Sequence, residues 1–275
     1  MNNKLQNIIL KTKRKFFSHH HGENTSYFNG SGLEFNEVRQ YNIDDDIRHI
    51  NWKITARTRT PSVNLYFESR SIDVCIVYLN SGGLFFGEDK KKKETADEIL
   101  TSLSFIVPFN NDNLSTVFYD NTKQTIYKAT KNKKQVHINN DHVKALDPLN
   151  KNIDYKHLEK YLLQNVKKKS ILFFIGDFLE IPNFELLSKK YEIYCVVVRH
   201  KDEEKIDFNG ECIIIDTNTT NQKSMNINND IVKQYNKYMI KFDKDLFNYF
   251  KENRVHFNKI YTHENSIEKL ALLLK

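Results

Sequence analysis

The stretch that decides the fold is Asp73-Val74-Cys75-Ile76-Val77-Tyr78-Leu79, followed by Asn80-Ser81-Gly82-Gly83. A run that is apolar on both faces of an extended backbone is typical of a strand buried inside a parallel sheet, because a strand with one solvated face would alternate. The polar and glycine-rich residues after Leu79 indicate that the strand ends there in a loop. Residues 73–79 therefore predict the first strand of a buried, parallel sheet.

Similar apolar runs recur along the chain, with helical patterns between them. We expect further buried strands at residues 170–175, 193–198 and 212–215, and short strands at residues 63–67 and 258–261. A hairpin is expected from residues 115–119 and 124–127. Helices are expected at residues 94–107, 154–166, 182–190, 229–253 and 266–274. Strands that alternate with helices predict an α/β fold with a parallel-dominated sheet and helices on both faces.

Composition narrows the class of protein. The chain has 275 residues, 39% of them hydrophobic, which is enough for one large domain with an elaborated N-terminus. A shift in composition near residues 69–71 divides it into an N-terminal region, residues 1–70, and a sheet domain, residues 71–275. Three scattered cysteines form no disulfide framework, and no run approaches the ~18 apolar residues of a membrane span. We therefore expect a cytoplasmic protein.

The net charge of +7 leaves several partners open. Such a charge suits nucleic acid or an anionic membrane surface. The lysines are dispersed, however, and their two runs, residues 90–93 and 167–169, are expected in solvated loops. Residues 5–17 predict a short amphipathic helix that packs on the protein itself, with a peripheral membrane contact as the alternative. Residues 19–21, three adjacent histidines, are expected in a polar loop.

A second distinctive stretch, residues 30–66, precedes the first buried strand. Acidic residues and arginines alternate there with bulky apolar residues, and the only tryptophan of the chain lies among them. Arginine pairs bidentately with carboxylates and tolerates partial burial. We therefore expect a folded platform in which Trp52 is largely buried and Arg39, Arg48 and Arg57 each reach a carboxylate. The candidate carboxylates are Glu34, Glu37, Asp44, Asp45 and Asp46.

The order of residues in this stretch resembles a known family signature. Gly-x-Gly-x-Glu-Phe at residues 30–35, Val-Arg-x-Tyr at 38–41, Asp-Asp-Ile-Arg-x-Ile-x-Trp-Lys at 45–53 and Ala-Arg at 56–57 resemble the bacterial domain-of-unknown-function 58 family. One departure is Asp44-Asp45, where the family usually has Gly-Asp. The signature and interaction residues that the resemblance implies are Gly30, Gly32, Glu34, Phe35, Glu37, Arg39, Tyr41, Asp45, Arg48, Ile50, Trp52, Lys53 and Arg57.

The resemblance implies a fold and a role. The family carries a von Willebrand factor A-like domain and is found with MoxR-type AAA+ ATPases. The implied function is non-enzymatic and needs no cofactor. It is that of a partner or adaptor of such an ATPase in the assembly or activation of other proteins.

The resemblance also implies where a divalent cation would bind. Von Willebrand factor A domains carry Asp-x-Ser-x-Ser at the end of the first strand, because hard cations need several oxygen ligands. Here the aspartate falls on Leu79, the serines on Ser81 and Gly83, and the family's threonine on Ile153, while Asp177 ends the second buried strand. Only Ser81 and Asp177 keep oxygen side chains. We therefore expect a degenerate site without metal, and partner recognition at this rim would have to use residues 80–86.

Two other function classes remain open. A nucleic-acid-binding protein is suggested by the charge, but the sequence has no arginine-rich helix and no basic-aromatic strand motif. A metal-dependent hydrolase could use Glu34, Glu37 and residues 44–46, although adjacent aspartates more often cap helices or pair with arginines. The chain has neither Gly-x-Gly-x-x-Gly nor a phosphate loop, so nucleotide binding has no support.

Overall fold

The computed structural model describes residues 33–68, 71–88, 90–167 and 169–273. The chain divides into two compact units between Ser71 and Ile72. We call the unit that contains residues 15–71 the signature unit, and the unit that contains residues 72–275 the sheet unit. The helix expected at residues 5–17, the three histidines, Gly30 and Gly32 lie outside the described residues.

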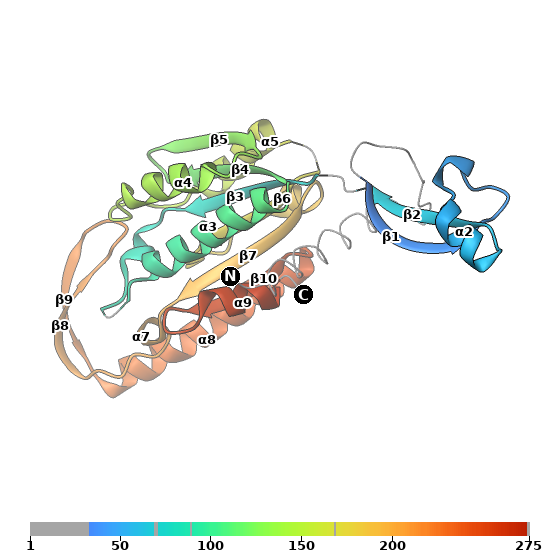
Figure 1. Ribbon diagram of the computed structural model, residues 1–275. Coiled ribbons are helices and arrows are strands. Elements are labelled where there is room, and N and C mark those ends of the chain that lie inside the picture. The colour runs from blue at the N-terminus through green and yellow to red at the C-terminus, as the bar shows by residue number, and fades with distance from the viewer. Residues whose placement is uncertain (1–32, 69–70, 89, 168, 274–275) are drawn as a thin grey trace. The chain divides into compact units, whose positions relative to one another are not determined.

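The sheet unit is built on a central sheet with the strand order β10-β7-β6-β3-β4-β5 (Figure 1). Its strands are β3 (Asp73–Leu79), β4 (Asn113–Tyr119), β5 (Gln124–Thr130), β6 (Ile171–Gly176), β7 (Glu192–Arg199) and β10 (His256–Tyr261). Neighbouring strands are parallel except β4 and β5, which form the expected hairpin. The residues of β3 after Asp73 are all buried, as their continuous apolar character predicts.

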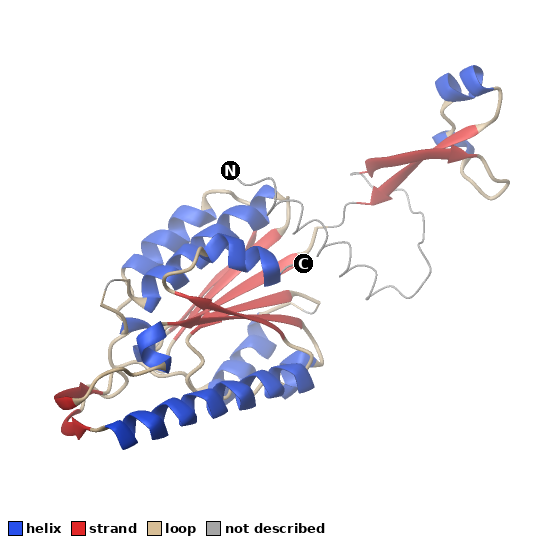
Figure 2. Ribbon diagram, turned by 90° about the horizontal axis from the view of Figure 1, so that it is seen from below, coloured by secondary structure: helices blue, strands red, loops and turns tan. Residues whose placement is uncertain are grey.

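Helices cover both faces of this sheet (Figure 2). On one face lie α3 (Lys92–Phe109), α4 (Gln135–Lys144) and α9 (Ser266–Leu273). On the other lie α5 (Tyr155–Asn165), α6 (Glu185–Ser188) and α8 (Asn229–Glu252), whose apolar residues pack with Cys75, Val77 and Leu79 in one core. The expected α/β fold class, a parallel-dominated sheet with helices on both faces, is therefore confirmed. No helix in the described part of the chain has the length and apolar character to cross a membrane.

The fourth buried strand, expected at residues 212–215, is a wrong prediction. That stretch forms β8 (Gly210–Ile215), which pairs only with β9 (Gln222–Ile227) in a separate antiparallel hairpin. Ile213, Ile214 and Ile215 are 66%, 44% and 53% exposed. A short apolar run does not by itself distinguish a core strand from an exposed one, because the signal contains no information on what covers the strand.

Among the described helices of eight or more residues, only α4 has no counterpart in the expected elements. The apolar pattern of α4 is weak because two of its four buried residues, Gln135 and Asn139, are polar. The buried amide of Asn139 donates to Ser104 Oγ (2.8 Å) and to Thr116 Oγ1 (2.9 Å), which ties the helix to α3 and β4. A helix held by buried amide hydrogen bonds is invisible to a search for apolar spacing.

The signature unit is a small antiparallel pair of strands with two short helices. β1 (Leu33–Gln40) pairs with β2 (Ser62–Glu68), and the connection holds a 3-10 helix η1 (Ile47–His49) and α2 (Trp52–Thr58). Asn51 caps α2 by accepting from the Ile54 N–H (3.0 Å), and its amide donates to Asn64 on β2 (2.9 Å). Thr55 Oγ1 accepts from the Ser62 N–H (3.0 Å). These bonds fix one side of α2 against β2.

Candidate functional site

The carboxyl ends of β3 and β6 lie next to each other in the middle of the sheet. The chain runs from β3 to β4 on one side and from β6 to β7 on the other, so the two connections lead toward opposite edges of the sheet. Ligands of such sheets bind outside the carboxyl ends of strands at this reversal point. The loop after β3, which contains the 3-10 helix η2 (Gly82–Phe85), and the loop after β6 are therefore the first candidates for a functional site.

The five positions of the implied metal site do not all meet. Ser81 donates from Oγ to Asp177 Oδ1 (2.9 Å), and both side chains are buried. Gly83 lies against the same carboxylate, because a Cβ on Gly83 would overlap Asp177 Oδ2. Leu79 instead faces the apolar core, and Ile153 packs against that core. The structure thus groups Ser81, Gly83 and Asp177 and turns the two apolar positions away.

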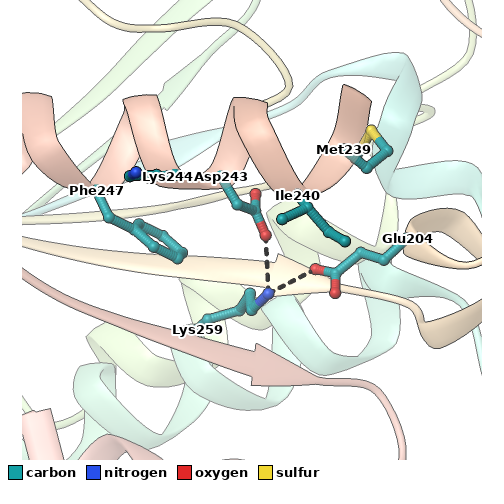
Figure 3. A pocket seen from close by; sticks show the side chains of 7 residues that line it. All are labelled: Glu204, Met239, Ile240, Asp243, Lys244, Phe247 and Lys259. Atoms are coloured by element: carbon teal, nitrogen blue, oxygen red, sulfur yellow. Dashed lines mark hydrogen bonds and ion pairs between the residues drawn. The ribbon is translucent and has the colours of Figure 1, made fainter. Parts of the chain in front are cut away.

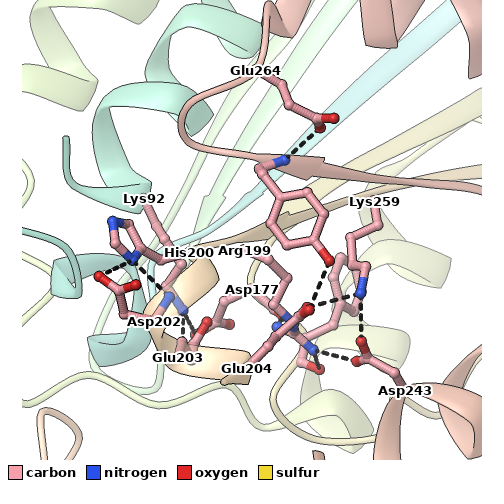
Figure 4. Close-up of polar contacts among 12 residues, drawn as sticks. Lys92, Asp177, Arg199, His200, Asp202, Glu203, Glu204, Asp243, Lys259 and Glu264 are labelled. Atoms are coloured by element: carbon pink, nitrogen blue, oxygen red, sulfur yellow. Dashed lines mark hydrogen bonds and ion pairs between the residues drawn. The ribbon is translucent and has the colours of Figure 1, made fainter. Parts of the chain in front are cut away.

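A buried lysine completes this group. Lys92, the first residue of α3, is fully buried, and its Nζ lies 2.6 Å from Glu203 Oε1 and 3.8 Å from Asp177 Oδ2 (Figure 4). Glu203 belongs to the short helix α7 (Lys201–Glu204). An ammonium beside Asp177 repels a second cation, and one carboxylate with one hydroxyl supplies few ligands for Mg²⁺ or Ca²⁺. The donor set therefore does not fit a resident divalent cation.

Arg199, at the end of β7, extends the polar cluster along the carboxyl edge. Its buried guanidinium donates to the carbonyl oxygens of Asp177 and Phe178 and from Nη2 to Asp243 Oδ1 (3.3 Å). Its Nε lies 3.7 Å from Glu204 Oε1. By binding the two carbonyls, Arg199 fixes the backbone that carries the Asp177 carboxylate.

Lys259 on β10 closes the cluster at the sheet edge. Its Nζ lies 2.8 Å from both Glu204 Oε1 and Asp243 Oδ2, and Tyr261 donates to Glu204 Oε2 (2.7 Å) (Figure 4). Burial alone would lower the pKa of Lys259, but the hydrogen bonds to the two carboxylates outweigh it and raise that pKa. A groove along α8 borders this ion cluster (Figure 3). It is lined by Glu204, Met239, Ile240, Asp243, Lys244, Phe247 and Lys259.

We call the seven charged residues the edge cluster. Its members are Lys92, Asp177, Arg199, Glu203, Glu204, Asp243 and Lys259. Each of its four carboxylates lies within 4.0 Å of one of its three cations. These ion pairs connect the residues at the ends of β6 and β7 and on β10 to α3, α7 and α8. Among the described residues, no three His, Cys, Asp or Glu side chains are placed to share a metal ion.

Two cysteines, Cys75 and Cys195, are buried in the core of the sheet unit. Burial raises the pKa of Cys75 to about 12 and also raises that of Cys195. The thiolate is the reactive form of cysteine, so these two side chains act as small apolar core residues.

The signature residues confirm only part of the expected charge network. Arg39 binds Asp45 bidentately at 2.6 and 2.8 Å, and the Asn42 N–H donates to the same carboxylate. The bond from Asn42, together with those from Arg39, lowers the pKa of Asp45. Arg48 binds Asp46 at 2.7 Å in an exposed pair, whose hydrogen bonds lower the Asp46 pKa to about 2.

The rest of the expectation for the signature is wrong. Trp52 is 68% exposed rather than buried, because α2 turns Ile54 and Thr55 inward and its first residue outward. Arg57 is exposed and contacts no carboxylate in the described part of the chain. Of the other signature residues, Glu37 and Lys53 are exposed, while Tyr41 and Ile50 are half-buried. Glu34 and Phe35 lie on β1, and their side chains are outside what the structure describes.

Two members of the edge cluster, Lys92 and Arg199, stand at positions in the sequence that could have indicated a functional role but were not predicted. Lys92 belongs to the lysine run at residues 90–93, which was expected to be solvated, yet it is the fully buried member. Arg199 follows directly on the apolar run of residues 193–198, at the place where a strand end would carry a functional group. Nothing in a single sequence indicates that Glu203 and Asp243 would meet these cations.

The chain is similar in sequence to one protein family and to proteins from mycobacteria. A family profile described as "Protein of unknown function DUF58" matches residues 37–243. Uncharacterized proteins of Mycobacterium bovis and Mycobacterium tuberculosis are 26% identical over 134 residues, which is 48% of this chain and 42% of theirs. The matched part thus spans less than half the length of these relatives.

Several solved structures are similar in backbone arrangement. BatB from Bacteroides thetaiotaomicron has a TM-score of 0.46 at 8% identity, covering 74% of this chain and 97% of that chain. An aerotolerance-related membrane protein from Bacteroides fragilis has a TM-score of 0.48 at 10% identity, covering 74% and 96%. The VWA domain of SpRpn10 has a TM-score of 0.39 at 8% identity, covering 74% and 94%.

Proposed function

Because this chain belongs to the DUF58 family of proteins of unknown function, we propose that it acts as a non-enzymatic protein-interaction protein. In this role it is a cytoplasmic partner, or adaptor, of a MoxR-type AAA+ ATPase and assists the assembly or activation of other proteins. The ATPase supplies the energy of nucleotide hydrolysis, and this chain supplies recognition.

The edge cluster is the observation that carries the proposal. At the carboxyl edge, where a sheet of this kind would bind a small ligand, each carboxylate of the cluster is engaged by a cation of the same chain. Carboxylates that are already paired with cations are poorly placed to act on a substrate, and this favours a binding role over a catalytic one. In the loop after β3, Leu84 is fully buried, while Phe85 and Phe86 are each 37% exposed and form an apolar rim.

The alternative of a metal-dependent hydrolase built on the acidic signature residues draws less support. Asp45 and Asp46, two of its candidate ligands, are bound by Arg39 and Arg48. A carboxylate held by a guanidinium would have to release it before binding a metal ion.

The proposal is tested by combining the purified chain with the purified MoxR-type ATPase of the same organism. We expect the two to co-elute in size-exclusion chromatography and the rate of ATP hydrolysis to change when the chain is added. Absence of both effects would refute the adaptor role. A mobility shift with DNA or RNA that persists at 200 mM salt would instead favour a nucleic-acid-binding protein, since nonspecific binding to phosphates falls steeply with salt.

A further inference from the structure

The signature unit exposes large apolar side chains close together in the sequence. Ile43 is 93% exposed, Ile47 64% and Trp52 68%. Single exposed apolar residues need no explanation, but three within ten positions, one of them the only tryptophan of the chain, indicate an interaction surface. Trp is also the residue type most enriched among the side chains that dominate binding energy at protein interfaces.

Cations accompany Trp52 on α2. Successive residues of a helix are about 100° apart, so Trp52, Lys53 and Arg57 fall on one side, away from Ile54 and Thr55. Arg59 follows at the C-cap of α2 and is exposed. Among the described residues, Lys53, Arg57 and Arg59 contact no carboxylate, in contrast to Arg39 and Arg48. The uncompensated charge on this side of α2 is therefore positive.

The charge balance favours a protein over a nucleic acid as the occupant. The sequence of the signature unit, residues 15–71, has seven lysine or arginine residues and seven aspartate or glutamate residues, so the unit has no net positive charge. Asp44, next to Ile43, is exposed and would repel a phosphate backbone. A nucleic-acid surface relies on a continuous basic stripe, whereas a protein interface combines aromatic anchors with a few matched charges.

We propose that the signature surface, which we define as Ile43, Ile47, Trp52, Lys53, Arg57 and Arg59, is the docking site for the partner protein. The occupant is an acidic patch of that partner that surrounds an apolar pocket. The pocket takes the Trp52 ring, and carboxylates of the partner pair with Lys53, Arg57 and Arg59. This inference rests on the proposed function, because the ATPase is the partner used to test it, and it assigns recognition to α2 rather than to the rim at Phe85 and Phe86.

The experiment measures binding of the purified MoxR-type ATPase to the full chain by interferometry. We expect Trp52→Ala to weaken the affinity about 30-fold or more, as for an aromatic anchor, and Trp52→Phe to weaken it less. Arg57→Glu should weaken it at least tenfold, more strongly at 50 mM than at 300 mM salt, because screening reduces the charge term. The single tryptophan also reports directly, since its fluorescence should shift to the blue when the pocket covers it.

Matched controls come from an exposed part of α8. Tyr238, 61% exposed, and Lys237 are also exposed side chains, so Tyr238→Ala and Lys237→Glu should leave the affinity within a factor of two. Circular dichroism checks that every variant is folded, which we expect because the altered side chains are exposed.

The possible outcomes separate the two proposals. If the ATPase binds equally to Trp52→Ala and Arg57→Glu, or if only Phe85→Ala weakens it, the docking site is wrong and the adaptor role stands. If the unaltered chain binds no ATPase, both proposals fall. A Trp52 emission that is already blue-shifted in the chain alone would mean that the protein covers this surface itself, and would also overturn the docking site.

Discussion

Replacing Lys92 by methionine should destabilise the sheet unit strongly. The side chain of Lys92 is fully buried, and those of its partners Glu203 and Asp177 are each 7% exposed. The Glu203 carboxylate makes its only hydrogen bond within the described residues to Lys92, and its Oε2 has no partner there. Removing one member of a buried ion pair costs about 3–5 kcal/mol, because the other charge stays buried. Methionine keeps the apolar stem, so the loss should come from the charge.

The assay is urea unfolding followed by far-UV circular dichroism, a signal dominated by the helices and strands of the sheet unit. A loss of about 4 kcal/mol with an m-value of about 3 kcal/mol/M lowers the midpoint of the transition by about 1.3 M.

A matched substitution two positions earlier sharpens this test. Lys90 pairs with Glu98 at 2.8 Å, but its side chain is 30% exposed and that of Glu98 49%, so Lys90→Met should cost less than about 1 kcal/mol. Adding Glu203→Gln to Lys92→Met should recover part of the lost stability, because the stranded charge disappears. If Lys92→Met costs no more than Lys90→Met, the ammonium does not neutralise the buried carboxylates and the account of the edge cluster is wrong.

Three further predictions follow from the described geometry. Calorimetric titration with Mg²⁺ or Mn²⁺ should give no binding tighter than about millimolar, and micromolar binding abolished by Asp177→Ala would contradict this. Burial alone would raise the pKa of Asp120, but hydrogen bonds from Thr122 and the Lys123 N–H outweigh it and lower the folded-state pKa below 3.8. The stability that Asp120 contributes is therefore complete above pH 3.8 and is lost as the pH falls through the folded-state pKa. Asp120→Asn should flatten the acid limb of a stability–pH curve. Ile175→Ala, at a fully buried position of β6, should cost about 2–5 kcal/mol in urea unfolding, whereas Ile214→Ala on the exposed β8 should cost under about 1 kcal/mol, and equal losses would show that β8 is covered.

The sequence predicted the sheet better than its surroundings. Residues 73–79, 170–175 and 193–198 are apolar on both faces, and all three runs lie in the parallel sheet. The same rule failed for residues 212–215, because a run of four apolar residues has the same pattern in a core strand and in an exposed hairpin. Burial is a property of what packs against a strand, and a local pattern does not contain it.

The candidate site was predictable at its strand ends but not in its charges. The positions of Ser81 and Asp177 follow from where apolar strands stop, and the two side chains do meet. The partners of Lys92 lie 85 and 111 positions away in the chain, so no spacing rule connects them. The burial expected for Trp52 was wrong for a related reason. Interleaved apolar and charged residues are equally typical of a buried platform and of an exposed binding surface, and only the direction in which α2 faces decides between them.

The position of Gly83 has a consequence for how this protein can change over generations. A lineage that gained from holding a divalent ion would need more than one serine at this position, because a Cβ on Gly83 overlaps the Asp177 carboxylate. That carboxylate in turn is tied by the hydroxyl of Ser81 and faces the ammonium of Lys92. A side chain at position 83 alone would clash with Asp177, and loss of Lys92 alone would leave buried carboxylates without their cation. A divalent-cation site at this edge would therefore require coordinated changes at Gly83 and Lys92 and could not arise by one substitution.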